Sequence, residues 1–169
     1  MPEEYFQPKA EGAIVERESC RGKVGADNQL VYELENVKVK LDVWQHKGKG
    51  TTYIGIAFKI FDGGNALWPE QVIHGYIDEK AINFSAKEFS RLRVVNGELL
   101  SKEYPINSLM VKTTKNESET YYESFQLSNE LVSEISIQNI KVIINGKEHT
   151  LSDMIFTKKS GVFLHPLNC

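Results

Sequence analysis

Residues 37–61 read VKVKLDVWQHKGKGTTYIGIAFKIF, and this stretch decides the fold. In residues 37–43 valine and leucine occupy the odd positions, and lysine and aspartate occupy the even ones. Residues 54–60 alternate in the same way, because isoleucine and phenylalanine fill every second position. A period of two predicts strands with one buried face. The polar, glycine-containing residues 48–50 fit a hairpin loop, so the stretch predicts two neighbouring antiparallel strands.

Other segments carry the same signal in both directions along the chain. Strands are expected at residues 71–80, 108–114, 119–127 and 141–151. The last of these contains Asn145-Gly146, a pair that supplies the two positive-φ positions of a type I′ hairpin turn. Asn96-Gly97 repeats that signal between apolar residues. The chain therefore contains many short strands separated by turns.

Helical signals are sparse. The spacing of Ser85 and Glu88 matches a capping box, and Phe89 and Leu92 follow it on one face of a short helix. Residues 127–135 could hold a further helical turn or open a strand. Many strands with one or two short helices predict an all-β fold, mainly an antiparallel β-sandwich, with a barrel-like arrangement as the alternative. We interpret residues 1–169 as a single domain.

Composition excludes several classes of protein. The chain has 169 residues, of which 41% are hydrophobic and 25% charged, and its formal net charge is −3. This is enough apolar material for a core, which excludes a disordered chain. A nucleic-acid-binding protein usually shows a basic excess, and none is present here. No apolar run approaches the length of a membrane-spanning helix, so a transmembrane protein is not expected.

Motifs for catalysis or for a cofactor are missing. The four histidines, His46, His74, His149 and His165, form no metal-ligand spacing, and the sequence has no Gly-x-Ser-x-Gly elbow and no phosphate-binding glycine loop. We therefore expect a non-enzymatic protein without a cofactor. A hydrolase of unrecognised type is the alternative.

One surface is predicted as a binding site. If the apolar residues of 37–43 face the core, the same strand directs its other side chains outward: Lys38, Lys40, Asp42, Trp44 and His46. An exposed aromatic side chain flanked by charges is typical of a binding anchor. Trp68, in a loop that follows the second strand, is the other aromatic candidate for this surface. The alternative is that Trp44 packs beneath the loop containing Trp68 and belongs to a second layer of the core.

The two cysteines, Cys20 and Cys169, lie near opposite ends of the chain. One interpretation is a disulfide between them, which would persist in an oxidising compartment such as the periplasm. The other is two unrelated free thiols, which would fit the cytoplasm. The N-terminus lacks the features of a signal peptide, so export would require a segment removed before Met1, and a lipid anchor could lie on that segment.

In its strand pattern, its early Cys20 and its closing Asn145-Gly146-Lys147 hairpin, the chain resembles small envelope proteins of bacteria. These include mature lipoproteins with β-sandwich folds and periplasmic immunity proteins that neutralise toxins. The resemblance implies an envelope or periplasmic binding protein that acts by protein–protein contact. The alternative hypothesis is a sandwich or barrel that binds a small apolar ligand or a glycan.

Overall fold

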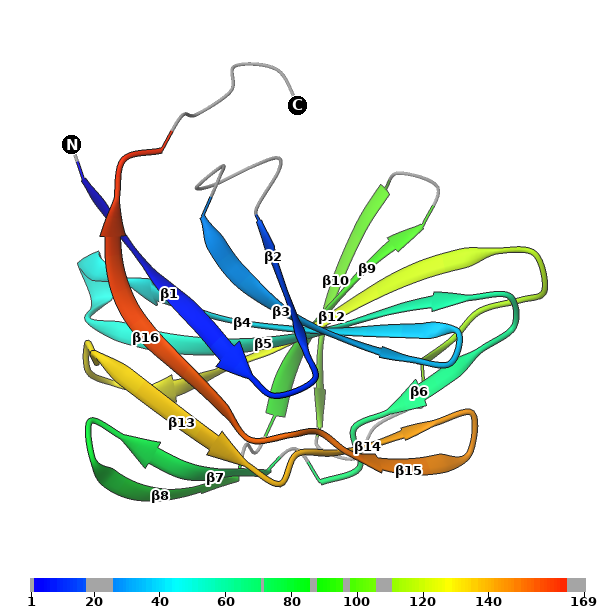
Figure 1. Ribbon diagram of the computed structural model, residues 1–169. Helices are drawn as coiled ribbons and strands as arrows, with labels where there is room; N and C mark the ends of the chain where they lie inside the picture. The colour runs from blue at the N-terminus through cyan, green and yellow to red at the C-terminus, as the bar shows by residue number, and fades with distance from the viewer. Residues whose placement is uncertain are drawn as a thin grey trace.

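The protein is an all-β, sandwich-like assembly of open antiparallel sheets (Figure 1). The computed structural model describes residues 2–17, 26–70, 72–85, 88–95, 98–105 and 111–163. A seven-stranded sheet has the order β10 (Glu98–Pro105), β9 (Glu88–Val95), β12 (Ser118–Ser128), β5 (Thr51–Phe61), β4 (Val37–His46), β3 (Asp27–Leu34) and β2 (Ile14–Arg17). The predicted all-β class is confirmed.

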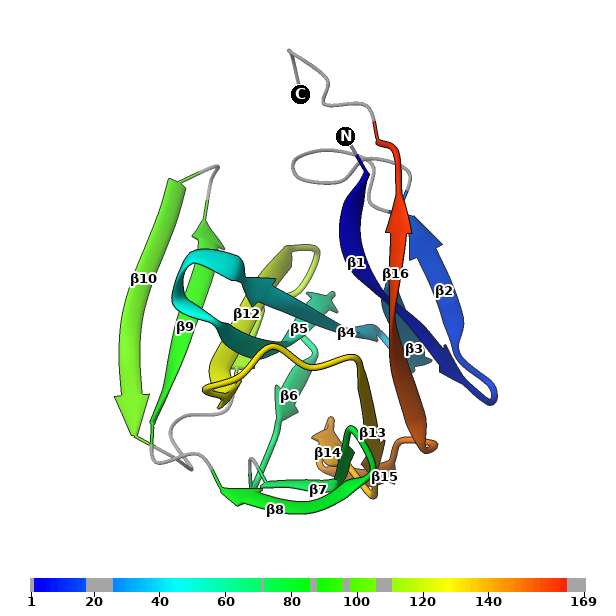
Figure 2. The same ribbon diagram turned by 90° about the vertical axis from the view of Figure 1, so that its left-hand side faces the viewer.

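Two further sheets complete the fold. A five-stranded sheet has the order β1 (Glu3–Ala10), β16 (Met154–Gly161), β13 (Glu134–Gln138), β7 (Val72–Ile77) and β8 (Lys80–Ser85). A four-stranded sheet has the order β11 (Val111–Lys112), β6 (Asn65–Leu67), β14 (Lys141–Ile144) and β15 (Lys147–Thr150). Figure 2 shows the five-stranded sheet curving around one face of the central strands β4 and β5, while β9 and β10 lie on the far side of β12.

The predicted pairing of the two decisive strands is confirmed. β4 and β5 pair in an unbroken antiparallel register from Val37 opposite Ile60 to His46 opposite Thr51. The loop between them is a single 3-10 turn, η1 (Lys47–Lys49), which ends at Gly50 in a left-handed conformation with φ 63°. The alternation therefore sends one set of side chains from both strands into the core and the other set to the outside.

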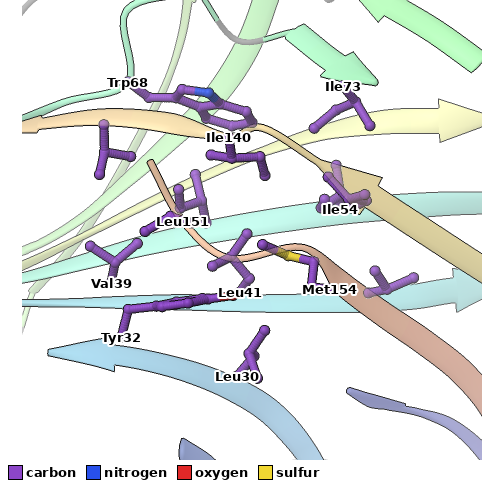
Figure 3. Packing of buried hydrophobic residues seen from close by; sticks show 14 of the residues in the cluster. Leu30, Tyr32, Val39, Leu41, Ile54, Trp68, Ile73, Ile140, Leu151 and Met154 are labelled. Carbon is purple, nitrogen blue, oxygen red and sulfur yellow. The ribbon is translucent and has the colours of Figure 1, made fainter. Parts of the chain in front are cut away.

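The core lies between the central strands and the two smaller sheets (Figure 3). β5 contributes four fully buried side chains to it: Ile54, Ile56, Phe58 and Ile60. Burying one such side chain contributes about 1.5–3 kcal/mol. Strands β13, β14 and β16 meet them from the other side, and the buried apolar side chains of the described residues form one continuous cluster. One face of β4 and β5 packs against this cluster, so the opposite face lies on the outside of the sheet.

Tyr32 contributes a polar group to the core. Its ring is buried, and its hydroxyl donates a hydrogen bond to the backbone oxygen of Ser152 at 3.0 Å. Burial raises the pKa of the Tyr32 hydroxyl above its ordinary value, with a smaller opposing effect from its hydrogen bond with the Ser152 side chain. The hydroxyl thus anchors β3 to the segment that leads into β16.

The helical predictions are wrong. Ser85 ends β8 and Glu88 begins β9, so the capping-box residues lie in strands that belong to two different sheets. Residues 127–135 contain the end of β12, an irregular segment and the beginning of β13. Strand pairing overrides the local signal here, because β9 pairs with β10 on one side and with β12 on the other. In the described part of the chain, η1 is the only helical segment.

The turn prediction at Asn145-Gly146 is confirmed. These residues join β14 to β15, and both have positive φ, 49° and 81°. The turn at Asn96-Gly97 lies outside the described residues, although β9 and β10 on either side of it do pair. At Asn145-Gly146 the two-residue turn joins strands that pair directly in antiparallel register, from Ile144 opposite Lys147 outward.

Asn145 also connects its own turn to the β3–β4 turn and to the start of β6 through its side chain. Its Nδ2 donates to Glu35 Oε2 at 2.6 Å and to Asn36 Oδ1 at 2.7 Å, and its Oδ1 accepts from the backbone N–H of Asn65 at 2.9 Å. Asn145→Ala removes these hydrogen bonds. It also places alanine at a positive φ, a conformation that asparagine tolerates better because its side chain can form hydrogen bonds there. We expect a loss of about 2 kcal/mol in the free energy of unfolding, measured by urea denaturation.

Asn145→Gly is the matched control for this prediction. It removes the same side-chain bonds but accepts the positive φ, so its loss should be about 1 kcal/mol. Equal losses in the two variants would assign the whole effect to the side-chain bonds. A loss below measurement error in both would mean that the connection contributes nothing to stability.

Candidate binding cleft

The outer face of the seven-stranded sheet is built in rows across its central strands. One row places Lys40 of β4 beside Ala57 of β5 and Tyr122 of β12. The neighbouring row places Asp42 beside Gly55 and Ser124 in the same strands. These side chains share a face because every second residue of a strand points the same way. The middle position of each row lies on β5 and holds a small residue, Ala57 in the first row and Gly55 in the second.

A cleft of about 490 Å³ lies over these rows. Such a volume falls in the range of small-ligand sites, roughly 300–1,000 Å³. Its floor is formed by the small residues of β5 and β12, and larger side chains of β3, β4 and β12 surround it. Its lining includes Gln29, Lys40, Asp42, Trp44, Gly55, Ala57, Lys59, Thr120, Tyr122 and Ser124. We call this the Trp44 cleft.

Gly55 lies directly beneath the side chains of Asp42 and Trp44. A Cβ atom at this position would lie 2.7 Å from Asp42 Oδ1 and 2.7 Å from Cζ3 of Trp44. Both distances are too short for a Cβ atom, so only glycine lets the carboxylate and the indole rest on the sheet at the same place. The sequence thereby brings an aromatic ring and a carboxylate together over one residue.

The Trp44 ring is held in place and remains accessible. It stacks on Tyr53, its cross-strand neighbour, with ring centroids 5.7 Å apart and an angle of 10° between the planes. The side chain is nevertheless 39% exposed. Tyr122, on the β12 side of the cleft, is 44% exposed. An exposed ring fixed by stacking costs little entropy when a ligand binds to it.

The charges of this face are largely compensated. Lys40 Nζ lies 2.8 Å from Glu16 Oε2, and Lys38 Nζ lies 3.5 Å from Glu33 Oε1. Lys59 stands opposite Lys38 across β4 and β5, and its Nζ lies 5.4 Å from the centroid of the Phe61 ring. Such exposed pairs contribute little to stability. They do, however, leave the cleft close to electrical neutrality.

The structure brings together part of the surface that the sequence predicts. Lys38, Lys40 and Trp44 share the outer face of β4, and the last two line the cleft. His46 lies at the end of the same strand, where its Nδ1 accepts a hydrogen bond from the backbone N–H of Lys49 at 3.2 Å. His46 therefore caps the 3-10 turn and does not line the cleft.

Trp68 does not belong to that surface. It is 4% exposed and packs in the core, where Figure 3 shows its ring beside Ile140. Trp44 lies on the opposite, outer face of the seven-stranded sheet, so it does not pack beneath the Trp68 loop either. Trp68 directly follows β6, and the pairing of β6 with β14 brings this part of the chain over the core, so the Trp68 side chain points inward.

Several cleft residues are not among those that the sequence predicts for this surface. Gly55 and Ala57 were visible as small residues on the outer side of β5, which is a signal that something approaches that strand closely. Tyr122 and Ser124 could not be assigned, because their place depends on the register between β12 and β5. Gln29 depends in the same way on the position of β3.

A second, smaller cleft of about 380 Å³ lies elsewhere, where the end of β6, β7 and the turn before β14 meet. Its lining includes Glu70, His74, Asn139 and Lys141, with an edge of Trp68. Lys141 is 3.8 Å from Glu148, and the described lining brings no aromatic face into solvent comparable to that of Trp44. We therefore take the Trp44 cleft as the candidate site.

The remaining predictions concern cysteines, metals and membranes. Cys20 and Cys169 both lie outside the described residues, so their pairing stays a prediction. Among the described residues no cluster of three or more histidine, cysteine, aspartate or glutamate side chains is arranged to hold a metal ion. The same residues include no helix long and apolar enough to cross a membrane.

No family model, no curated protein and no solved structure matches this chain. The function must therefore be argued from the cleft itself.

Proposed function

We propose that the protein is a non-enzymatic binding protein whose ligand lies in the Trp44 cleft. The observation that carries this proposal is the convergence of Trp44 and Asp42 over Gly55. An open cleft with a fixed aromatic ring, a carboxylate and a small-residue floor is the arrangement that binding sites use: apolar area for affinity and a few placed polar groups for orientation.

The placement of the carboxylates supports a role in binding without catalysis. Asp42 and Glu123 are the carboxylates among the described lining residues, but Glu123 is buried and follows Tyr122 in β12, so its side chain points to the other face of the sheet. A pair of carboxylates flanking a substrate, as hydrolysis of a glycosidic bond requires, is therefore not formed by them. Turnover in a broad screen of esterase, peptidase and glycosidase substrates would contradict this part of the proposal.

The exposed tryptophan provides a direct test of the site. Trp44 is exposed and Trp68 is buried, so acrylamide should quench the emission of Trp44 and spare that of Trp68. A ligand in the cleft should shield Trp44 and reduce this quenching. A ligand that binds with measurable affinity and leaves the quenching unchanged would show that the site lies elsewhere.

Contact with a protein partner is the first version of this function. Tryptophan is enriched at binding hot spots, and Trp44 is exposed on the outer face of β4, an interior strand of the seven-stranded sheet. In this version the chain is an envelope or periplasmic binding protein, for example an immunity protein that neutralises a toxin, or a mature lipoprotein. Stoichiometric binding to a toxin encoded beside it, lost in Trp44→Ala, would support this version. Failure to bind any toxin encoded beside it would contradict the role as an immunity protein.

An envelope location depends on the cysteines. We expect the non-reduced protein, recovered from its native compartment, to have a mass about two daltons below the reduced formula and to take up no thiol-blocking reagent, since a disulfide removes two hydrogens. This result would support export. Two labelled thiols would favour the cytoplasm, and they would leave the Trp44 cleft as the proposed site.

A ring-shaped small ligand is the second version, and a specific observation favours it. The floor of Gly55, Ala57 and Ser124 leaves a depression between Trp44 and Tyr122, whereas a flat sheet face would suit a large protein surface better. The space between the sheets is filled by the core, so the ligand of this version lies on the outer face.

A further inference from the structure

The aromatic part of the Trp44 cleft is suited to a flat ring with apolar C–H groups. The indole rests on Gly55 and stacks on Tyr53, which fixes its plane before any ligand arrives. A pyranose ring presents such a C–H face, and it gains contact area against an aromatic surface without needing a charged partner.

The polar groups beside the ring suit hydroxyls. Asp42 Oδ1 lies over the same glycine as the indole, so it can accept a hydrogen bond from a hydroxyl at the edge of a ring stacked there. The Ser124 and Tyr122 hydroxyls and the Gln29 amide line the same cleft, and each can both donate and accept. Sugar hydroxyls also donate and accept, whereas an apolar ligand would displace water from the Ser124, Tyr122 and Gln29 side chains without replacing its hydrogen bonds.

The charge balance favours a neutral ligand. Lys40 pairs with Glu16 at 2.8 Å, and the carboxylate of Asp42 lies in the same cleft as the ammonium of Lys59. An acidic sugar or an acidic peptide would meet Asp42 and would have to compete with Glu16 for Lys40. A neutral ring can hydrogen-bond to the groups of the cleft without competing with Glu16 for Lys40.

From these three observations we infer that the Trp44 cleft binds a neutral pyranose unit of an oligosaccharide, stacked on Trp44 with a hydroxyl hydrogen-bonded to Asp42. This inference rests on the binding function proposed above and names the ligand class of that site.

The test uses the full chain and a panel of oligosaccharides, measured by isothermal titration calorimetry and by Trp44 shielding. The neutral members are derived from cellulose, xylan, mannan, starch and chitin, and the acidic members are oligogalacturonates and alginates. We expect at least one neutral oligosaccharide to bind with a Kd below about 1 mM. Its binding should weaken at least tenfold in Asp42→Asn or Trp44→Ala and stay unchanged in Tyr76→Ala, an exposed aromatic on the five-stranded sheet.

The other outcomes separate the ligand class from the function. Binding of acidic members alone, or of a protein partner with shielding of Trp44, overturns the neutral sugar and leaves the proposed function standing. If no neutral oligosaccharide of the panel binds, the inference of a neutral sugar ligand is also overturned. Binding that is insensitive to both Trp44→Ala and Asp42→Asn overturns the sugar site and the proposed function together.

Gly55→Ala tests the geometry without removing a binding group. The new methyl group would lie 2.7 Å from both Asp42 Oδ1 and the Trp44 ring, and these are side-chain ends that can move away. We expect a folded protein whose affinity for the oligosaccharide is about tenfold lower, because the ring and the carboxylate no longer rest together on the sheet. Gly50→Ala, at a left-handed turn with open space around it, is the control for a general glycine effect. Equal affinity in wild type and Gly55→Ala would contradict the stacking geometry.

Discussion

Gly75→Ala is expected to abolish most of the folded population. Gly75 lies in the middle of β7, where it pairs with Ile137 of β13 and with Ile82 of β8. Its φ is 152°, and a Cβ atom there would lie 1.8 Å from the backbone oxygen of Ser136. This is far inside any permitted contact, and the obstacle is a strand of the sheet rather than a movable side chain.

The neighbouring strand cannot yield without loss elsewhere. β13 also pairs with β16 on its other side, and Ile135 and Ile137 are fully buried. Moving the backbone of Ser136 away would therefore disturb two pairings and the core. We expect a loss of about 4 kcal/mol or more, a large part of the stability of a typical domain, visible as a non-cooperative or strongly lowered thermal transition by circular dichroism.

Gly12→Ala is the matched control for this prediction. Gly12 has φ 70°, and a Cβ atom there would meet nothing within 4 Å. Its substitution isolates the conformational cost of a positive φ, about 1 kcal/mol. If Gly75→Ala were no less stable than Gly12→Ala, the close approach of β7 to β13 would be refuted.

Local pattern was sufficient for the elements whose neighbours in the sheet are also neighbours in the chain. β4 and β5 followed from alternation, and the β14–β15 hairpin followed from Asn145-Gly146. The need for glycine at position 75 could not be predicted in this way. It arises from β13, which lies about 60 residues away in the chain and approaches from the side.

The capping-box signal failed for a related reason. Ser85 and Glu88 have the spacing of a helix start, but β8 is held by β7 and β9 is held by β12 and β10. Strand pairing on both sides of residues 86–87 outweighs a cap worth about 1 kcal/mol. Local rules therefore give way where tertiary pairing competes with them.

The residues of the candidate site fall into the same two groups, those that local alternation predicts and those that depend on tertiary pairing. Alternation was enough to place Lys40 and Trp44 on the outer face of β4. Trp68 was assigned to that surface from its loop alone, and the pairing of β6 with β14 buries it instead. The convergence of Asp42 and Trp44 on Gly55 requires the register of β4 on β5, and the contribution of Tyr122 requires that of β12.

Trp44→Ala is expected to have the largest effect on binding. The indole supplies the exposed aromatic surface at the end of the cleft nearest Gly55, and no other described lining residue can replace its ring there. We expect the affinity for the best oligosaccharide of the panel to fall about 30-fold, which corresponds to about 2 kcal/mol, measured by isothermal titration calorimetry. The free energy of unfolding should fall by only about 1 kcal/mol, since the lost contacts are those with Tyr53 on the outer face.

Two further variants show whether this loss comes from the ring itself. Trp44→Phe keeps a smaller ring over Gly55, so we expect it to recover part of the affinity, with a loss of about threefold relative to wild type. Tyr76→Ala removes a ring that is 46% exposed on the five-stranded sheet, and it should leave binding unchanged. Equal weakening by Trp44→Ala and Tyr76→Ala would point to a general effect of exposed aromatics. Unchanged affinity in Trp44→Ala would remove the ring from the site, because a ligand stacked on the indole cannot bind equally well without it.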